Sequence, residues 1–257
     1  PGQKNVIVVK ADNSNDSSYP PGKPQESLDF AYFGGIYRDA YLISTGPVYI
    51  TDPNEAGTVA GGGIFFRTES LDPRTRKGKV GVKVQVANNT DKEQKVRVQA
   101  LMTDPKGVDP VGETAPLVIP PHSTGEVDIP LVISNVRPWS PDNPNLYTLS
   151  VEVWKAAGGA DAKNPAHLLD NRSMRVGVRT VEITEKGLVL NGSLFPEKLI
   201  GGNRHQDFAR LGNAVPNNLQ WQDAVKLRKA GMRVIRSAHY PQDPAFMDAC
   251  DRLGLFV

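Results

Sequence analysis

The sequence has only one cysteine, Cys250, among its 257 residues. A single cysteine cannot form a disulfide within the chain, so packing and hydrogen bonds must hold the fold together. It does not identify the compartment, because bacterial periplasmic enzymes can also lack disulfides. We therefore leave the localisation open between the periplasm and the cytoplasm of a bacterium.

Long apolar runs and an excess of one charge are also missing. No stretch of 18 consecutive apolar residues occurs, so no membrane-spanning helix is expected. The 30 Lys and Arg residues nearly balance the 28 Asp and Glu residues and are interspersed with them. This balance argues against a nucleic-acid partner and against binding to an anionic membrane. There is no GxGxxG or Walker pattern either, so a phosphate cradle at Gly201-Gly202 is poorly supported.

The first three quarters of the chain have the alternating apolar and polar pattern of half-buried β-strands. The expected strands are residues 5–12, 36–44, 78–88, 95–102, 125–133 and 146–154. Strands at this spacing, without helical patterns between them, predict an immunoglobulin-like β-sandwich over residues 47–179. The preceding residues 1–46 are too few for a domain, and we interpret them as the C-terminal part of another β-sandwich.

The pattern changes after Arg179 to strands that alternate with helices. Residues 198–205 predict a strand that leads into a loop, residues 233–239 predict a second strand, and "LFV" at the C-terminus predicts the start of a third. A helix is expected over 217–231, with Asn218 as its cap and Gly231 as its stop. A second helix is expected to begin after Asp243 and to end at Gly254. This order predicts that residues 180–257 begin a parallel α/β fold.

Two histidines occupy equivalent places in this pattern. His205 follows the first parallel strand and His239 follows the second, 34 positions later. Polar residues just beyond the carboxyl ends of parallel strands face the ligand in such folds. A single loop histidine is more often an ordinary surface residue, but two at matching strand ends predict a shared binding site.

Zinc binding is the main alternative for these histidines, and it requires three or four close ligands. The other histidines, His122 and His167, lie in the predicted sandwich, and Cys250 belongs to the apolar stripe of a helix. The sequence therefore does not favour a zinc site.

Several segments resemble glycoside hydrolase family 2 of the β-galactosidase type. They are "GGIYRDAYLI", "RPWSPDNPNLYTL", "VGVRTVEITEKGLVLNG", "GGNRHQD" and "VIRSAHYPQDPAFMDACDRLGLFV". The resemblance runs along nearly the whole chain in the family's order. It implies a multidomain protein: the tail of a jelly-roll sugar-binding domain, an immunoglobulin-like domain, and the first β/α units of a TIM (β/α)8 barrel.

The resemblance also implies roles for individual residues. His205 and His239 would hydrogen-bond hydroxyls of the terminal sugar, with Asn203 as a further substrate-binding residue. Arg204 and Arg236 match positions that shape the pocket. Asp29 matches an acidic residue that reaches the site from the first domain, where it contacts the sugar and a sodium ion. Where the best-known members carry further histidines, this chain has Phe208, Ala209 and Arg210, which leaves the preferred sugar and linkage open.

The resemblance implies retaining hydrolysis of terminal β-linked sugars, with β-galactosides as the expected substrates. Such hydrolysis uses two carboxylates about 5–5.5 Å apart, which in this family are glutamates on later barrel strands. Glu197 is the last glutamate here, so no residue of this chain is expected to be catalytic. Because both ends of the chain fall inside expected strands, we expect the chain to be a fragment, and without those glutamates we expect it to be inactive alone. It would need no cofactor, while the parent enzyme could bind Mg and Na and form homo-oligomers.

Two alternatives remain open. The parent could be a β-glucuronidase or a β-mannosidase, which share this architecture. The chain could instead belong to a noncatalytic carbohydrate-binding β-sandwich protein, although the β/α tail with its paired histidines argues against this. Two glutamates at the ends of later barrel strands of the parent protein would identify it as an enzyme.

Overall fold

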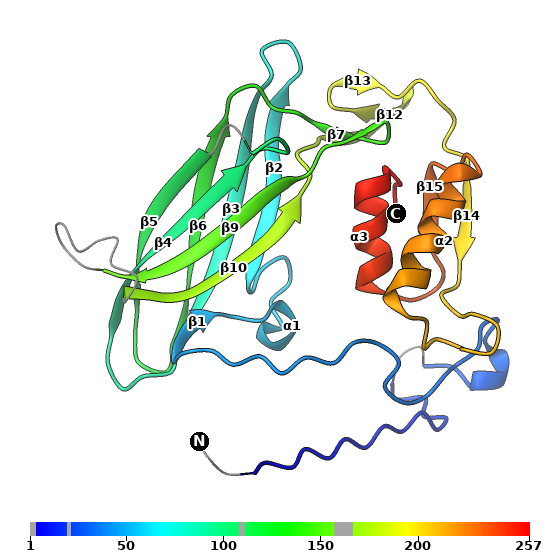
Figure 1. Cartoon of the computed structure of the whole chain (residues 1–257), viewed down its shortest axis with the longest axis horizontal. Helices are drawn as coiled ribbons and strands as arrows, with labels where there is room; N and C mark the ends of the chain where they lie inside the picture. Colours follow the sequence, from blue (N-terminus) through cyan, green and yellow to red (C-terminus); the bar gives the residue numbers. More distant parts are fainter. Residues whose placement is uncertain (1–3, 20–21, 108–110, 157–166) are drawn as a thin grey trace. The chain divides into compact units, whose positions relative to one another are not determined.

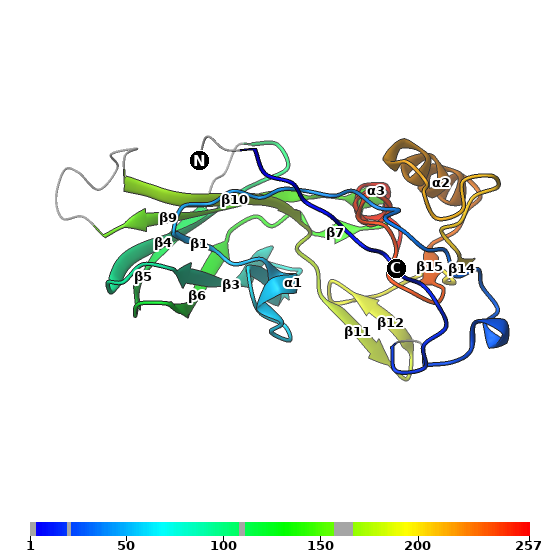
Figure 2. The same ribbon diagram turned by 90° about the horizontal axis from the view of Figure 1, so that it is seen from below.

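The computed structural model describes residues 4–19, 22–107, 111–156 and 167–257. These residues form two compact units (Figures 1 and 2). One unit is Ile43–Lys198, and the other joins Pro1–Leu42 to Leu199–Val257. Among the described residues, no helix combines the length and the apolar character that a membrane span requires.

The unit Ile43–Lys198 is an antiparallel β-sandwich (Figure 1). In its first sheet β3 is central, with β6 along one edge and both β1 and β2 along the other. The second sheet has the order β10-β9-β4-β5. The strands of the first sheet are β1 (Val48–Ile50), β2 (Ile64–Asp72), β3 (Lys77–Asn88) and β6 (Ser123–Ile133). Those of the second are β4 (Gln94–Thr103), β5 (Val111–Ile119), β9 (Tyr147–Lys155) and β10 (Leu168–Val176). The predicted immunoglobulin-like sandwich is confirmed.

The two sheets share one apolar core, made by the inward residues of the alternating strands. Val82 and Val84 of β3 and Val98 of β4 are fully buried. Each such side chain contributes about 1.5–3 kcal/mol on burial. Smaller elements complete the unit. They are the one-turn helix α1 (Pro53–Ala56) and the two-residue strands β7 (Trp139–Ser140) and β8 (Asn143–Pro144).

A buried tyrosine fixes the turn into β9. Tyr147 is almost fully buried, and its hydroxyl accepts a hydrogen bond from the backbone N–H of Arg137, at 2.9 Å. This contact matches the tyrosine corner of immunoglobulin-like sandwiches, in which a tyrosine hydroxyl bonds the backbone a few residues upstream. Burial is the main cause that raises the pKa of Tyr147, so the neutral hydroxyl remains available as an acceptor.

A small three-stranded sheet follows the sandwich. Its strands are β11 (Val181–Thr184), β12 (Gly187–Leu190) and β13 (Ser193–Leu194). Asn191 attaches it by donating from Nδ2 to the carbonyl of Trp139, at 3.0 Å. The sheet therefore groups with the sandwich, whereas the sequence assigned it to the third part of the chain. The predicted domain bounds of 1–46, 47–179 and 180–257 stay predictions.

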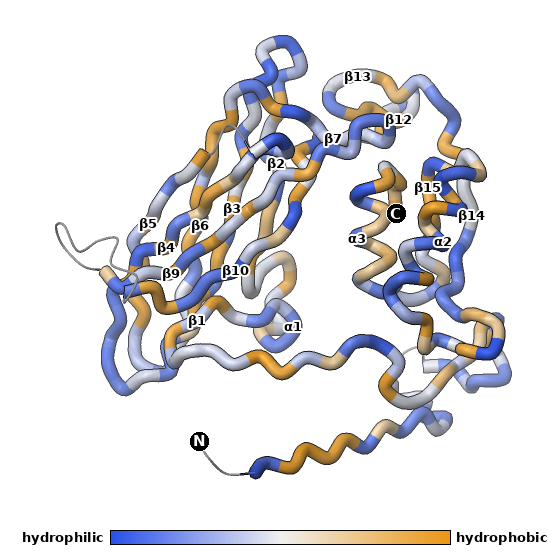
Figure 3. Tube along the Cα trace, viewed as in Figure 1, coloured by the Kyte–Doolittle hydropathy of each residue, from blue (hydrophilic) through white to orange (hydrophobic). Residues whose placement is uncertain are grey.

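The expected strands at residues 5–12 and 36–44 are wrong. Apart from the short 3-10 turn η1 (Gln25–Ser27), the described residues before β1 have no regular secondary structure. The apolar run Val6–Val9 is exposed and stands out in the hydropathy colouring (Figure 3). A strand needs a neighbour to pair its N–H and C=O groups, and no described segment pairs with these residues.

The second unit contains the β/α elements. They are β14 (Gly201–Arg204), α2 (Asn217–Lys229), β15 (Val234–Ser237) and α3 (Pro244–Leu253). β14 and β15 are parallel, as predicted. The expected third strand is present only as a single parallel bridge between Phe256 and Val234.

The helix ends agree in part with the sequence analysis. Asp243 caps α3 by accepting from the N–H of Ala245, and Gly254 ends the helix with a positive φ of 74°. Asn218 does not cap α2, because the helix begins earlier and its N-cap position is Pro216. The two helices pack on Ile235 through Ala224, Phe246 and Cys250. Burial raises the pKa of Cys250 to about 12, so this thiol is a neutral core residue.

We expect Tyr147→Phe to lower the free energy of unfolding by about 1–2 kcal/mol, because the Arg137 N–H loses its acceptor in a buried place. Urea unfolding followed by circular dichroism measures the change. Tyr49→Phe is the matched control, since the hydroxyl of this half-buried tyrosine has a contact of only 3.5 Å with Asn89. Equal stability of both variants would show that the corner hydrogen bond contributes nothing.

Candidate functional site

The site is built where β14 and β15 end side by side. Their parallel register places Asn203 opposite Arg236 and Arg204 opposite Ser237. The chain leaves both strands at the same edge, and the rings of His205 and His239 meet there with centroids 5.5 Å apart and nearly perpendicular planes. The structure thus brings together the two histidines that the sequence places at matching strand ends.

A segment far away in the sequence reaches the same place. The ring of Phe30 lies 6.3 Å from that of His205 and 6.0 Å from that of His239. Beside it, Oδ2 of Asp29 lies 3.9 Å from Nε2 of His239. The expected proximity of Asp29 to the histidines is therefore present. The Asp29 side chain is 82% exposed, and such an exposed contact contributes little free energy. Both groups remain able to bond a ligand.

Hydrogen bonds define the orientation of the His239 ring. Nη1 of Arg236 lies 3.3 Å from Nδ1 of His239 and 3.4 Å from Oδ1 of Asn203. A guanidinium only donates, so Nδ1 is the acceptor and the hydrogen of the neutral imidazole is on Nε2. His239 therefore presents an N–H donor on the side of Asp29. Arg236 thus joins this ring to Asn203, and the side chains of Arg236 and Asn203 are both exposed.

Arg204 points to the opposite face of the strand and is only 7% exposed. Its guanidinium donates to three acceptors, at 2.5–2.8 Å, and lies 3.8 Å from the ring centroid of Phe246. The acceptors are Asp223 and Gln220 of α2 and Gln242 before α3. Arg204 thus joins the end of β14 to both helices, an arrangement compatible with its predicted pocket-shaping role. The roles of all six predicted site residues stay predictions.

Sequence reasoning missed a second set of contacts around Gln206. This residue is almost fully buried, and its backbone N–H donates to the hydroxyl of Tyr240, at 3.1 Å. Its Oε1 accepts from Nη2 of Arg38, at 3.1 Å, and Arg38 also donates to the carbonyl of Pro241. Arg38 therefore ties the two histidine-bearing loops together. It lies in "GGIYRDAYLI", so the resemblance marked the segment without indicating this contact.

Among the residues that the structure describes, no group of three or more His, Cys, Asp or Glu side chains could hold a metal ion. His122 instead contacts Asp91, at 2.9 Å, in the sandwich unit. Asp29 offers one exposed carboxylate, which suits a sodium ion but does not form a complete coordination site by itself. Sodium at Asp29 stays a prediction.

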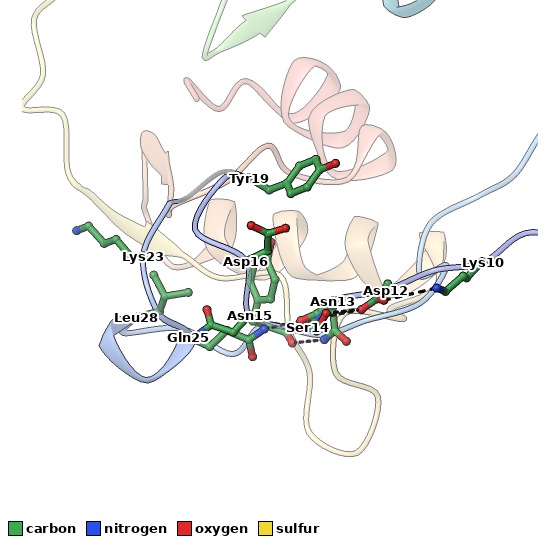
Figure 4. Close-up of a pocket in the computed structure, with 11 residues that line it drawn as sticks. Lys10, Asp12, Asn13, Ser14, Asn15, Asp16, Tyr19, Lys23, Gln25 and Leu28 are labelled. Atoms are coloured by element: carbon green, nitrogen blue, oxygen red, sulfur yellow. Dashed lines mark hydrogen bonds and ion pairs between the residues drawn. The ribbon is translucent and has the colours of Figure 1, made fainter.

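A separate polar pocket of about 370 Å³ lies in the N-terminal loop (Figure 4). Lys10 and Asp12 stand at one end of it and Lys23 and Leu28 at the other. The carboxylate of Asp12 accepts from the backbone and the hydroxyl of Ser14, and these bonds lower its pKa. Asp16 is bound by Ser18 in the same way. Both carboxylates stabilise turns of their own loop, so we assign the pocket no role.

Comparison with protein families identifies two matching models. The model of glycosyl hydrolases family 2 matches residues 62–179, and the model of the TIM barrel domain of glycosyl hydrolases family 2 matches residues 181–257. Together the two matches cover most of the chain.

Curated relatives match over nearly the full chain. A β-galactosidase of Thermoanaerobacter pseudethanolicus is 29% identical over 99% of this chain and 30% of its own length. A β-glucuronidase of Bacteroides fragilis is 30% identical over 99% of this chain and 34% of its own length. The chain thus spans about a third of these relatives.

Solved structures of similar proteins also superpose on most of this chain. The β-glucuronidase of Parabacteroides merdae superposes with a TM-score of 0.73 at 27% identity, covering 95% of this chain and 27% of that protein. A glycosyl hydrolase family 2 member from Bacteroides cellulosilyticus also has a TM-score of 0.73 at 27% identity, over 87% of this chain and 28% of its own.

We expect Arg204→Ala to destabilise α2 and α3 by about 3 kcal/mol, because it leaves buried acceptors without a donor. The amides of these helices should then exchange with solvent roughly 100-fold faster, as hydrogen-exchange mass spectrometry would show. Arg236→Ala removes the same side chain from the exposed face of the sheet and should leave this exchange unchanged. Equal protection in both variants would contradict the role of Arg204.

Proposed function

We propose that this chain, which belongs to glycosyl hydrolase family 2, forms one face of the sugar site of a retaining glycosidase that cleaves terminal β-linked sugars. The chain would supply groups that bind and orient the sugar. The carboxylates that break the glycosidic bond would come from strands beyond β15, as the family resemblance implies. The roles of individual residues below are part of this proposal.

The meeting of His205, His239 and Asp29 at one edge is the observation that supports this most. Sugar hydroxyls both donate and accept hydrogen bonds, and this edge offers both kinds of partner. The Nε2–H of His239 can donate, and the carboxylate of Asp29 can only accept. A hydroxyl between them could replace their long 3.9 Å contact with two shorter bonds.

The two imidazoles would act on the rate by binding, without forming or breaking bonds. Hydrogen bonds to sugar hydroxyls can strengthen as the ring distorts toward its oxocarbenium-like transition state. An interaction that is stronger in the transition state than in the ground state lowers the barrier. Arg236 would keep His239 in the productive orientation through its bond to the ring, and Asn203 would hold Arg236 by accepting from its guanidinium.

A β-galactoside is the substrate that we propose, because the motif segments resemble β-galactosidases. A β-glucuronide is the second candidate. It is supported by the relative from Bacteroides fragilis, which is named a β-glucuronidase, and by the exposed guanidinium of Arg236 beside His239, which could pair with a substrate carboxylate.

We expect His205→Ala and His239→Ala to slow hydrolysis by the whole enzyme roughly 30- to 1000-fold, with the loss in kcat as well as in kcat/KM. The reason is the lost transition-state hydrogen bond. Steady-state kinetics on nitrophenyl β-galactoside and nitrophenyl β-glucuronide would measure it and decide between the two sugars. His122→Ala is the matched control, because His122 lies in the sandwich unit. Near-parental rates in both site variants would make these histidines structural.

We expect the 257-residue chain alone to hydrolyse neither nitrophenyl glycoside. A retaining mechanism needs an acid/base carboxylate and a nucleophilic carboxylate on either side of the bond, and the resemblance assigns both to later strands. The purified chain, incubated with each glycoside at high protein concentration, tests this. Turnover that co-purifies with the chain and is lost in Asp29→Asn would contradict the assignment.

A further inference from the structure

The segment of residues 28–42 reaches the histidines without forming a helix or a strand. Asp29 contacts His239, and the ring of Phe30 lies beside both imidazoles. No β-ladder holds these two residues in place, and burial contributes little, since most side chains of the segment are exposed. Side-chain contacts must therefore fix where this segment lies on the β/α elements.

Arg38 makes the first of these contacts. Its Nη2 atom donates to Oε1 of Gln206, at 3.1 Å, and to the carbonyl oxygen of Pro241. Gln206 directly follows His205, and Pro241 comes two positions after His239. A hydrogen bond from a charged donor is stronger than one between neutral groups, and Gln206 is almost fully buried. One nitrogen atom therefore holds the segment to a neighbour of each histidine.

Asp39 makes the second contact, with the start of α2. Its Oδ2 atom accepts from Nδ2 of Asn217, the first residue of this helix, at 2.9 Å. The hydroxyl of Tyr41 donates to the same oxygen, also at 2.9 Å. Arg38 and Asp39 together thus join the segment to the loops after β14 and β15 and to α2.

A packing contact occurs between Phe30 and Arg38 in the sequence. The ring of Phe33 lies so close to Gly212 that a Cβ atom at Gly212 would come within 2.7 Å of it. Gly212 also has a φ of 55°, in the region that favours glycine. The loop between β14 and α2 is therefore shaped to receive the segment at a point that does not depend on the hydrogen bonds of Arg38 and Asp39.

We propose that Arg38 and Asp39 are positioning residues, which hold Asp29 and Phe30 at the two imidazoles. In the part of the chain that the structure describes, neither residue forms a hydrogen bond or an ion pair with an imidazole. They therefore act through the segment and the two loops. The inference rests on the proposed function, because the site that they position is the proposed sugar site. It adds two residues outside that site on which the rate would depend.

The first experiment is a double-mutant cycle on the whole enzyme, with the nitrophenyl glycoside that it hydrolyses. Arg38→Met keeps an unbranched apolar stem and removes the donors. It should lower kcat/KM roughly 10- to 100-fold, as misplaced binding groups do. In the Asp29→Ala background the group to be positioned is already absent, so Arg38→Met should lower the rate further by no more than about 3-fold. Arg74→Met is the matched control and should leave the rate unchanged, because Arg74 is exposed in the turn between β2 and β3.

The second experiment observes the positions of the rings by NMR of the 257-residue chain. Nuclear Overhauser contacts between the Phe30 ring and both imidazoles should be present in the parent chain and lost in Arg38→Met. The imidazole proton shifts should then move toward those of Phe30→Leu, which lacks the aromatic ring. Asp39→Ala should weaken the same contacts. It removes only an exposed side chain, so it tests the inference even where Arg38→Met unfolds.

The outcomes separate this inference from the proposed function. Unchanged Phe30 contacts in folded Arg38→Met overturn the inference, and so do unchanged contacts in Asp39→Ala if Arg38→Met unfolds. An equal loss of rate from Arg38→Met with and without the Asp29 carboxylate also overturns it. If the whole enzyme hydrolyses neither glycoside, the proposed function fails, and the NMR contacts alone decide whether the two residues position the segment.

Discussion

The buried guanidinium of Arg204 is the interaction on which the β/α unit depends. One side chain satisfies acceptors on α2 and on the loop before α3, and it covers the ring of Phe246 in the core. A buried cation is costly unless its donors are paired, so the two helices must take positions that supply these acceptors. The end of β14 is thereby fixed, and His205, the next residue, is fixed with it.

The alternation of side chains along each strand then places the packing residues and the proposed binding residues on opposite faces. Successive side chains of a strand point to opposite faces, so Arg204 turns toward the helices while Asn203 and His205 turn toward the open face. The parallel partner β15 repeats this division, with Ile235 in the core and Arg236 exposed. The residues that we propose to bind the sugar can therefore be polar and incompletely paired, because their neighbours in the sequence carry the packing.

The sequence predicted best the features that depend on local periodicity. The sandwich strands, the two helices and the cap at Asp243 follow from apolar spacing and from the chemistry of single residues. The strands before β1 were mispredicted because strand formation also needs a partner, which a local pattern does not reveal. Asn218 was misplaced because several residues near a helix start can cap, and the true boundary depends on the turn at Pro216.

The candidate site shows a similar limit. Equal spacing from two strand ends was enough to predict that His205 and His239 meet. Asp29 followed only from the family resemblance, since nothing in its local pattern connects it to residues two hundred positions away. The contacts of Arg38, Gln206 and Tyr240 were missed entirely, because hydrogen bonds between distant loops leave no periodic trace in a single sequence.

The functional groups on the open face also limit the chemistry that this face can support. It combines N–H donors on His239 and Arg236 with one carboxylate, Asp29, which lies beside an imidazole and is largely exposed. A proton-transferring pair would need carboxylates in different environments, so that one is protonated while the other is charged. An exposed Asp29 with a donor beside it is suited to accept from a hydroxyl. The face therefore suits the sugar-orienting role that we propose for it, and such a role requires positions fixed as firmly as Arg204 fixes them.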